Sequence, residues 1–378
     1  MKQTKIWLSA TALIACSADI AATDHEVKCE APQSVIAFSS NRHDTAGIPA
    51  INTLDIYLMD VDQNGIPLSD AVSPLMGTNF DGLPALSPDG TGRIVFDSNR
   101  LRRVDVEPRE PPNTSDLFLM NHDGSDQTHL IRGSSATWSP NGKKIAFHAS
   151  ASGTGRPIRP DPGAATFDSD IFIAKVKDLL EGKKPKNLTF ADPRVYINDD
   201  PDWSPDGKKV AFTRHSVNDS HTNSITAEIH VLNLKKGTLK QLTHNEQEER
   251  APAWSPNGKR IAYMCRRGGP LSPQGLPTTF EICLMDLKNL DPSGFPVTTQ
   301  LTNNLVFDGG PHWSPDGKKI VFGRVQGLGL QQIWVMDLET LDPDGFPVAT
   351  QVTNAPGTQL FATWGEICAD ADDEDESQ

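Results

Sequence analysis

The sequence predicts an all-β protein, a six-bladed β-propeller of four-stranded antiparallel blades. Three observations carry this prediction. One short motif recurs along the chain, the strands expected around it come in sets of four, and the first and last strands complete a single blade. The composition is that of a globular chain, because no apolar run is long enough to span a bilayer.

The recurring motif joins an anchor residue to a tight turn and a buried strand. It reads DPDWSPDGKKVAF at 200–212, APAWSPNGKRIAY at 251–263 and GPHWSPDGKKIVF at 310–322. In such turns proline presets φ and glycine supplies the positive φ that other residues resist. Repeats of this length are typical of propeller blades. The anchors are Leu86, Trp138, Trp203, Trp254, Trp313 and Trp364.

Four strands are expected in each unit, and the anchor ends the first. The second strands are predicted at 35–38, 94–96, 145–147, 210–212, 261–263 and 320–322. The third strands are predicted at 55–60, 116–121, 170–174, 228–232, 281–286 and 332–337. Fourth strands are expected at 186–189, 240–243, 299–302 and 350–353.

The two ends of the chain are expected to share one blade, because the chain opens on a second strand and finishes on a first strand. Cys29 lies just before the opening strand and Cys368 just after the closing one, so we predict a ring-closing disulfide. Cys265 and Cys283 lie on neighbouring strands of one hairpin and form the second predicted bridge.

The first residues have the features of a signal peptide, with a basic start at 1–5 and an apolar stretch at 6–15. Residues 13–16, LIAC, match a lipobox, which predicts acylation of Cys16 and an anchor on the periplasmic face of the outer membrane. The alternative is cleavage near Ala21 or Ala22, which gives a soluble periplasmic or secreted protein. We therefore divide the chain into a signal peptide (1–15), a linker (16–33), the propeller (34–368) and an acidic tail (369–378).

The charge of the chain limits its partners. The formal net charge is −14 and no basic surface is evident, which argues against nucleic-acid binding. A basic partner fits better. The terminal run ADADDEDESQ is expected to be disordered. We expect a monomer that meets a membrane only through the anchor at Cys16.

The units, each followed by a strand such as EICLMD or QIWVMD and by QLT, resemble the TolB-type propeller repeat over roughly 34–367. That family includes periplasmic TolB proteins that bind other envelope proteins, the propeller of prolyl oligopeptidases, and oligogalacturonate lyases with a metal in the channel. The propeller starts soon after Cys16, so we expect the TolB amino-terminal α/β domain to be absent. We expect no hydrolase domain after the propeller, and no Gly-x-Ser-x-Gly elbow is present.

The loops between second and third strands are the predicted functional face, because long loops on a rigid scaffold commonly carry binding residues. Arginines recur where these loops begin, and acids recur before the anchors. One interpretation is a charged ring that takes an anionic ligand, and the other is ion pairing between blades. The arginines are Arg42, Arg100, Arg214, Arg266 and Arg324, and the acids are Asp81, Asp199, Asp200, Glu249 and Asp308.

Three histidines break the repeat and complete the candidate ligand-binding set: His148, His215 and His312. The resemblance to lyases would make them metal ligands, whereas strand-end histidines are commonly just polar loop residues. No cofactor is predicted, and a metal ion in the channel is left open. The run 60–65, DVDQNG, imitates a calcium loop but is predicted to be a hairpin turn. Phe295 and Phe346, in two near-identical loops, are expected to be exposed and to offer a protein contact.

The sequence thus favours a non-enzymatic binding or scaffolding propeller of the cell envelope that recognises a protein or peptide through its long-loop face. The alternative is a channel-centred polysaccharide lyase or hydrolase that uses a histidine-bound metal.

Overall fold

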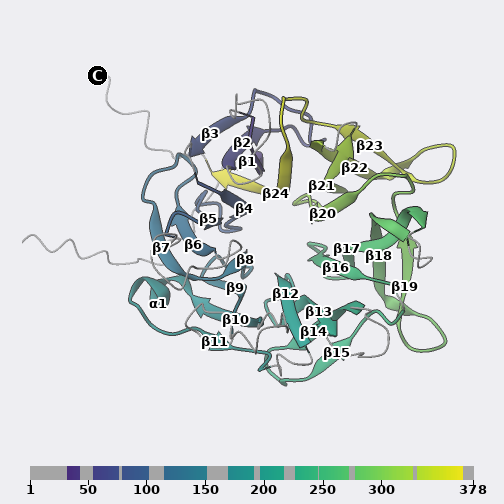
Figure 1. Ribbon diagram of the computed structural model, residues 1–378, viewed down its shortest axis with the longest axis horizontal. Coiled ribbons are helices and arrows are strands. Elements are labelled where there is room, and N and C mark those ends of the chain that lie inside the picture. The colour runs from purple at the N-terminus through teal and green to yellow at the C-terminus, as the bar shows by residue number, and fades with distance from the viewer. Residues whose placement is uncertain are drawn as a thin grey trace, which may run out of the picture.

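The computed structural model describes residues 32–42, 54–75, 79–101, 115–150, 169–190, 196–216, 226–245, 247–271, 277–326 and 330–368. Six four-stranded antiparallel sheets surround a central opening like the blades of a propeller (Figure 1). The predicted fold class and blade number are confirmed. Among the described residues, no helix has the length and apolar character needed to cross a membrane.

The inner strands line the centre of the ring, and each second strand lies against one of them. The inner strands are β4 (Asp81–Leu86), β8 (Ser134–Trp138), β12 (Tyr196–Trp203), β16 (Glu249–Trp254), β20 (Asp308–Trp313) and β24 (Gln359–Cys368). The second strands are β1 (Pro32–Ser40), β5 (Ile94–Ser98), β9 (Lys144–Ala149), β13 (Lys209–Ser216), β17 (Arg260–Leu271) and β21 (Lys319–Gln326). Five anchors end their strand as predicted, while Trp364 lies inside the longer β24.

The third and outer strands complete each blade. The third strands are β2 (Asp55–Asp60), β6 (Asp116–Met120), β10 (Asp170–Lys175), β14 (Thr226–Asn233), β18 (Pro277–Leu290) and β22 (Leu330–Leu341). The outer strands are β3 (Val72–Leu75), β7 (Thr128–Arg132), β11 (Lys186–Asn187), β15 (Leu239–Gln241), β19 (Pro296–Gln300) and β23 (Pro347–Gln351). One short helix, α1 (Val176–Leu180), follows β10 and was not predicted.

The outer strands end earlier than the sequence suggested. The threonine of each Leu-Thr or Val-Thr pair lies beyond the strand, where its hydroxyl serves the third strand of the same blade. Thr302 Oγ1 accepts the amide N–H of Ile282 at 3.0 Å and donates to Glu281 Oε2 at 2.5 Å. Thr243 and Thr353 make the same pair of contacts in their own blades. The motif therefore ties the outer edge of a blade to its middle.

The ring closes as predicted, with β24 and β1 side by side in one sheet of order β24-β1-β2-β3. Pro32 pairs with Cys368 and Ile36 with Trp364. Cys29 lies outside the described residues, so its bridge to Cys368 stays a prediction. The Cys265–Cys283 disulfide is present, with 5.8 Å between the Cα atoms.

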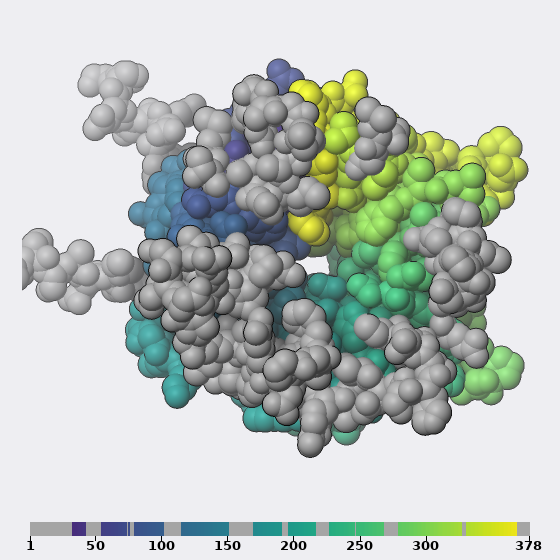
Figure 2. Space-filling view, in the orientation of Figure 1, coloured from purple at the N-terminus to yellow at the C-terminus, as the bar shows by residue number. Residues whose placement is uncertain are grey.

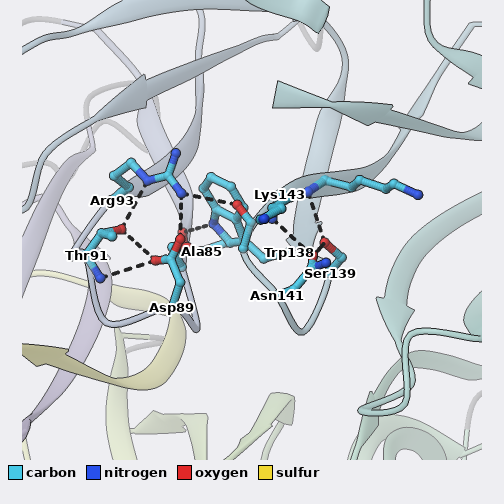
Figure 3. Close-up of polar contacts among 11 residues, drawn as sticks. Ala85, Asp89, Thr91, Arg93, Trp138, Ser139, Asn141 and Lys143 are labelled. Atoms are coloured by element: carbon cyan, nitrogen blue, oxygen red, sulfur yellow. Dashed lines mark hydrogen bonds and ion pairs between the residues drawn. The ribbon is translucent and has the colours of Figure 1, made fainter. Parts of the chain in front are cut away.

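The apolar core lies between blades as well as within them. One cluster packs Ile229 and Val231 of one blade against Trp254, Ile261 and Tyr263 of the next. Polar contacts cross the same boundary, as Figure 3 shows for a neighbouring pair of blades: Trp138 Nε1 donates to Ala85 O at 2.9 Å, and Arg93 donates to Gly142 O at 3.1 Å. Each anchor tryptophan thus packs at the boundary with the preceding blade.

Candidate functional site

The centre of the ring is a cavity of about 410 Å³ whose wall comes mainly from the inner strands. Figure 2 shows the hollow from one side. Each inner strand contains a bulge, and the bulge residue has a φ between 48° and 63° that turns it toward the cavity. The six residues of this bulge ring are Leu83, Ser135, Asp200, Ala251, Gly310 and Phe361.

A second ring of cavity residues lies two positions further along each strand, directly before the anchor. Because the inner strands run toward the Ser-Pro turns, this pre-anchor ring lies closer to the turn face, and the bulge ring lies closer to the long-loop face. The six residues of the pre-anchor ring are Ala85, Thr137, Asp202, Ala253, His312 and Thr363.

The two rings are not symmetric, because one strand alone supplies acids to both. Asp200 and Asp202 of β12 face the cavity, and no lysine or arginine is among the residues that line it in the described part of the chain. Asp200 accepts a long hydrogen bond of 3.4 Å from Ser135 Oγ. Asp202 accepts from Thr137 Oγ1 at 3.1 Å and from the Trp254 amide at 2.6 Å. Every one of these donors is neutral.

Burial without a cation changes the acidity of both carboxyls. Desolvation, followed by the nearby Asp199 carboxylate, raises the pKa of Asp200 to about 7. Desolvation also raises the pKa of Asp202 to about 7, against the opposing effect of its hydrogen bonds. A positive charge brought into the cavity would favour the ionised forms.

The wall opposite β12 is apolar. β24 supplies Leu360 and Phe361, and β12 and β24 lie on opposite sides of the central opening (Figure 1). Phe361 is 39% exposed although it is a large aromatic residue. Met264 and Phe307 extend the apolar surface along the neighbouring blades. The cavity therefore offers an acidic wall and an apolar wall to one ligand.

His312 belongs to the pre-anchor ring but already has a structural partner. Its Nδ1 lies 3.2 Å from the amide nitrogen of Trp364 in the closing blade. The same Nδ1 lies 3.2 Å from the carbonyl oxygen of Trp313. It therefore accepts from the Trp364 amide in one tautomer and donates to the Trp313 carbonyl in the other. Desolvation lowers the pKa of His312 to about 4, which keeps the ring neutral. His312 therefore links blades in the same way as Asp202, whose carboxylate accepts from the Trp254 amide.

The other two predicted histidines lie near each other on adjacent second strands, β9 and β13. His215 Nε2 contacts the carboxylate of Asp199 at 3.0 Å. Desolvation lowers the pKa of His148, and the charge of His215 adds to this effect. His312 lies two blades further around the ring. In the described part of the chain, no group of three or more His, Cys, Asp or Glu side chains is placed to hold a metal ion.

The predicted arginines are mostly used within their own blades. Arg100 pairs with Asp81 at 2.9 Å, and Arg324 binds both carboxylate oxygens of Asp308 at 2.7 Å. Arg266 pairs with Glu248 at 2.9 Å. Glu249 takes Arg267 as its partner at 2.7 Å. For these three predicted arginines the interpretation of pairing between blades is wrong, because each pairs with an acid at or next to the start of the inner strand of its own blade.

Two arginines of the set have no such ion pair among the described residues, and their guanidinium groups lie over aromatic rings. Arg214 Nε donates to Asn198 at 2.8 Å and its guanidinium lies 4.8 Å from the Tyr196 ring centroid. The Arg42 guanidinium lies 4.2 Å from the Tyr57 ring centroid. Such stacking holds the side chain in place without an anion. These arginines lie at the strand ends, outside the group of residues that line the cavity.

Several expectations concern loops. Most of the second-to-third loops, Cys16 and the tail at 369–378 lie outside the described residues.

The calcium-like run is a turn, as predicted: Asp62 Oδ1 accepts from the amides of Asn64 and Ile66, both at 2.8 Å. The expected exposed phenylalanines are both half-buried, because Phe295 stacks on His244 of the preceding blade at 5.5 Å.

Comparison with known proteins identifies the repeat. A family model described as the TolB beta propeller domain matches residues 201–356. Solved structures agree: TolB from Acinetobacter baumannii superimposes with a TM-score of 0.58 at 16% identity, covering 88% of this chain and 66% of that one. Residues 201–356 thus match the TolB-type repeat, and the whole ring shares its fold. A putative TolB from Agrobacterium tumefaciens gives 0.52 at 17% identity and covers 90% of this chain and 100% of that one.

Relatives that match parts of the sequence have other names. An uncharacterized peptidase, YuxL, of Bacillus subtilis is 28% identical over 153 residues, 40% of this chain and 20% of the relative. Dipeptidyl-peptidase 5 of Porphyromonas gingivalis is 44% identical over 68 residues, 18% of this chain and 10% of the relative. The chain thus spans at most a fifth of these two peptidases. An uncharacterized protein of Agrobacterium fabrum, Atu1656, is 28% identical over 253 residues, 60% of this chain and 79% of the relative.

Sequence reasoning placed the functional face on the loops and overlooked the wall of the TolB-type propeller channel. Asp200 was considered only as a partner for arginine, and Asp202 and Phe361 were not considered. A signal was present at two fixed positions, one and three residues before each anchor. Comparing these positions across the six units would have singled out the two acids of one blade.

Proposed function

We propose that this protein is a binding or scaffolding propeller of the cell envelope that recognises a protein or peptide at the long-loop mouth of its channel. The observation that carries the proposal is the exposed apolar surface formed by Leu360 and Phe361 at that mouth, facing two acids across a cavity of about 410 Å³. A cavity of this size holds one or two side chains of a partner. The rigid blades around it keep the site formed before binding.

Two further findings support the proposal. The Cys265–Cys283 disulfide fits an exported protein, because such bonds persist in oxidising compartments. Two relatives that match parts of this chain are named as peptidases, and peptidases act on peptides. The alternative enzyme with a histidine-bound metal has no specific observation in its favour among the described residues.

The test compares two matched substitutions in the full-length mature protein. Phe361 and Phe190 are both exposed phenylalanines with positive φ, 53° and 40°, and asparagine tolerates that backbone well. Phe361 lies in the channel, whereas Phe190 follows the outermost strand of another blade. Immobilised Phe361→Asn and Phe190→Asn proteins are incubated with an envelope extract, and bound proteins are quantified by mass spectrometry.

We expect a specific envelope protein to be retained by the wild type and by Phe190→Asn, and to be lost by at least about tenfold with Phe361→Asn. Equal retention by Phe361→Asn and the wild type would reject the channel mouth as the binding surface. Circular dichroism melting curves of the three proteins exclude misfolding as the cause.

A further inference from the structure

The two acids of β12 define a chemistry that the proposed function leaves open. Among the twelve positions of the bulge and pre-anchor rings, acids occur only at Asp200 and Asp202. The remaining positions hold small, apolar or neutral polar residues, together with His312. A feature of the scaffold would recur from blade to blade, as the anchors do. These acids occur once.

Three other acids, at the starts of their inner strands, pair with arginine, whereas Asp200 and Asp202 have no arginine partner among the described residues. Asp81, Glu249 and Asp308 are almost fully buried at the starts of their inner strands, and each has an arginine within 2.9 Å. Asp200 and Asp202 have hydroxyl and amide donors only. Both residues are half-buried in the cavity wall. A carboxylate withdrawn from water normally has a cationic partner or takes up a proton.

The charged groups around Asp200 do not supply that partner. Asp199 repels it, and His215 is already in contact with Asp199 at 3.0 Å. Arg250 is close enough to act on Asp200 through its charge, but its guanidinium is bound to Glu248 at 2.6 Å. The raised pKa of both acids is what such surroundings produce.

The apolar wall of the cavity, opposite β12, indicates what else the ligand of the two acids needs. Leu360 and Phe361 offer apolar surface across the cavity from the acids, and Phe307 adds an aromatic ring. A lysine or arginine side chain has matching parts, because an aliphatic stem carries its charge. A metal ion would gain nothing from the apolar wall.

We propose that the channel binds a basic side chain, lysine or arginine, of the partner peptide, with its charged end between Asp200 and Asp202 and its stem against Phe361. This inference rests on the proposed function and names the chemistry of its ligand. The partner supplies a cation that the residues lining the cavity lack. Its net charge of −14 favours the approach of such a partner.

The experiment measures binding of two fluorescein-labelled hexapeptides, Ser-Gly-Phe-Lys-Gly-Ser and the same sequence with norleucine in place of lysine, by fluorescence anisotropy at pH 8. The proteins are the full-length mature wild type, Asp200→Asn, Asp202→Asn and the double variant. Asparagine keeps the oxygen that accepts from the Trp254 amide, so the fold is preserved. Asp344→Asn is the matched control, because this acid is exposed on the loop between β22 and β23.

We expect the wild type and Asp344→Asn to bind the lysine peptide at least about tenfold more tightly than the norleucine peptide. The preference should fall below about twofold in the double variant, and the wild-type affinity for the lysine peptide should fall from pH 8 to pH 6. EDTA should have no effect. Equal affinity of the wild type for both peptides, no detectable binding of either, a preference that survives in the double variant, or its loss in EDTA would each overturn the inference.

This outcome is separable from that of the proposed function. If the double variant retains the envelope partner while Phe361→Asn loses it, the channel mouth is the binding surface, and the inference that it binds a basic side chain is wrong. If neither substitution affects retention, the proposed function fails as well.

Discussion

The pairing of Arg324 with Asp308 gives the sharpest test of whether the arginine set serves the fold or a ligand. Asp308 is fully buried, and Arg324 donates to both of its oxygens at 2.7 Å from a side chain that is 18% exposed. The same guanidinium lies 4.8 Å from the Trp334 ring centroid. Replacing Arg324 with methionine keeps the apolar stem and removes the charge.

The expected cost follows from what remains around the acid. In Arg324→Met, Asp308 keeps one hydrogen bond, from Asn304 Nδ2 at 2.8 Å, and loses its only cation. Breaking a buried pair on one side typically costs about 3–5 kcal/mol. Since the Asn304 bond remains, we expect a loss of about 3 kcal/mol in the free energy of unfolding, roughly a hundredfold in the folding equilibrium.

The assay is urea unfolding at pH 8, followed by tryptophan fluorescence. Lys318→Met is the control, because Lys318 and Glu339 form an ion pair of 3.2 Å between side chains that are 52% and 64% exposed. Such surface pairs contribute less than about 1 kcal/mol. A loss below about 1 kcal/mol for Arg324→Met would refute the structural role and return Arg324 to the set of ligand-binding candidates.

Three further predictions test other parts of the structure. His312→Leu should lower the free energy of unfolding by about 1–3 kcal/mol, because the Trp364 amide loses its acceptor, while His312→Asn should recover part of that loss in the same urea assay. Replacing Cys265 and Cys283 together with alanine should cost about 3 kcal/mol, because the bridge closes a loop of 18 residues in the unfolded chain, and a melting curve that matches the wild type would contradict this. Asp202 has an ordinary pKa of 3.8 that rises to about 7 on folding, so the folded state holds a proton that the unfolded state has released. Its stabilising contribution is present below pH 4 and is lost as pH rises through 7. Asp202→Asn should therefore gain stability relative to the wild type by on the order of 2 kcal/mol between pH 4 and pH 8, and a difference that does not vary with pH would contradict the raised pKa.

The fold could be predicted from the sequence because each blade repeats its own local chemistry. In the Ser-Pro-Asp-Gly turns, glycine takes a positive φ, 67° at Gly207 and 71° at Gly317, and the serine hydroxyl donates to the following acid. The strand after each turn is almost completely buried, which a β-branched and aromatic run predicts. These signals lie within a dozen residues of one another, so the sequence shows them directly.

The site could be predicted only in part, because its parts come from distant segments. The role of His312 depends on Trp364, and that of Asp202 depends on Trp254, each about one blade away along the chain. The end of the outer strands was placed too late for a related reason. A threonine that follows a strand is predicted to continue it, because threonine favours strands. In the structure the threonine hydroxyl instead binds a residue of the neighbouring strand.

Broken symmetry alone does not identify a binding site. His312 and Asp200 both depart from the repeat and both face the channel. His312 has partners within the protein, because its Nδ1 contacts the Trp364 amide and the Trp313 carbonyl, and burial lowers the pKa of its ring to about 4. Asp200 has only a 3.4 Å hydrogen bond from a hydroxyl and a pKa raised by burial. An unrepeated residue is therefore a better ligand candidate when the blades leave its charge and hydrogen-bonding capacity unmet. By that criterion Asp200 ranks above the histidines and arginines.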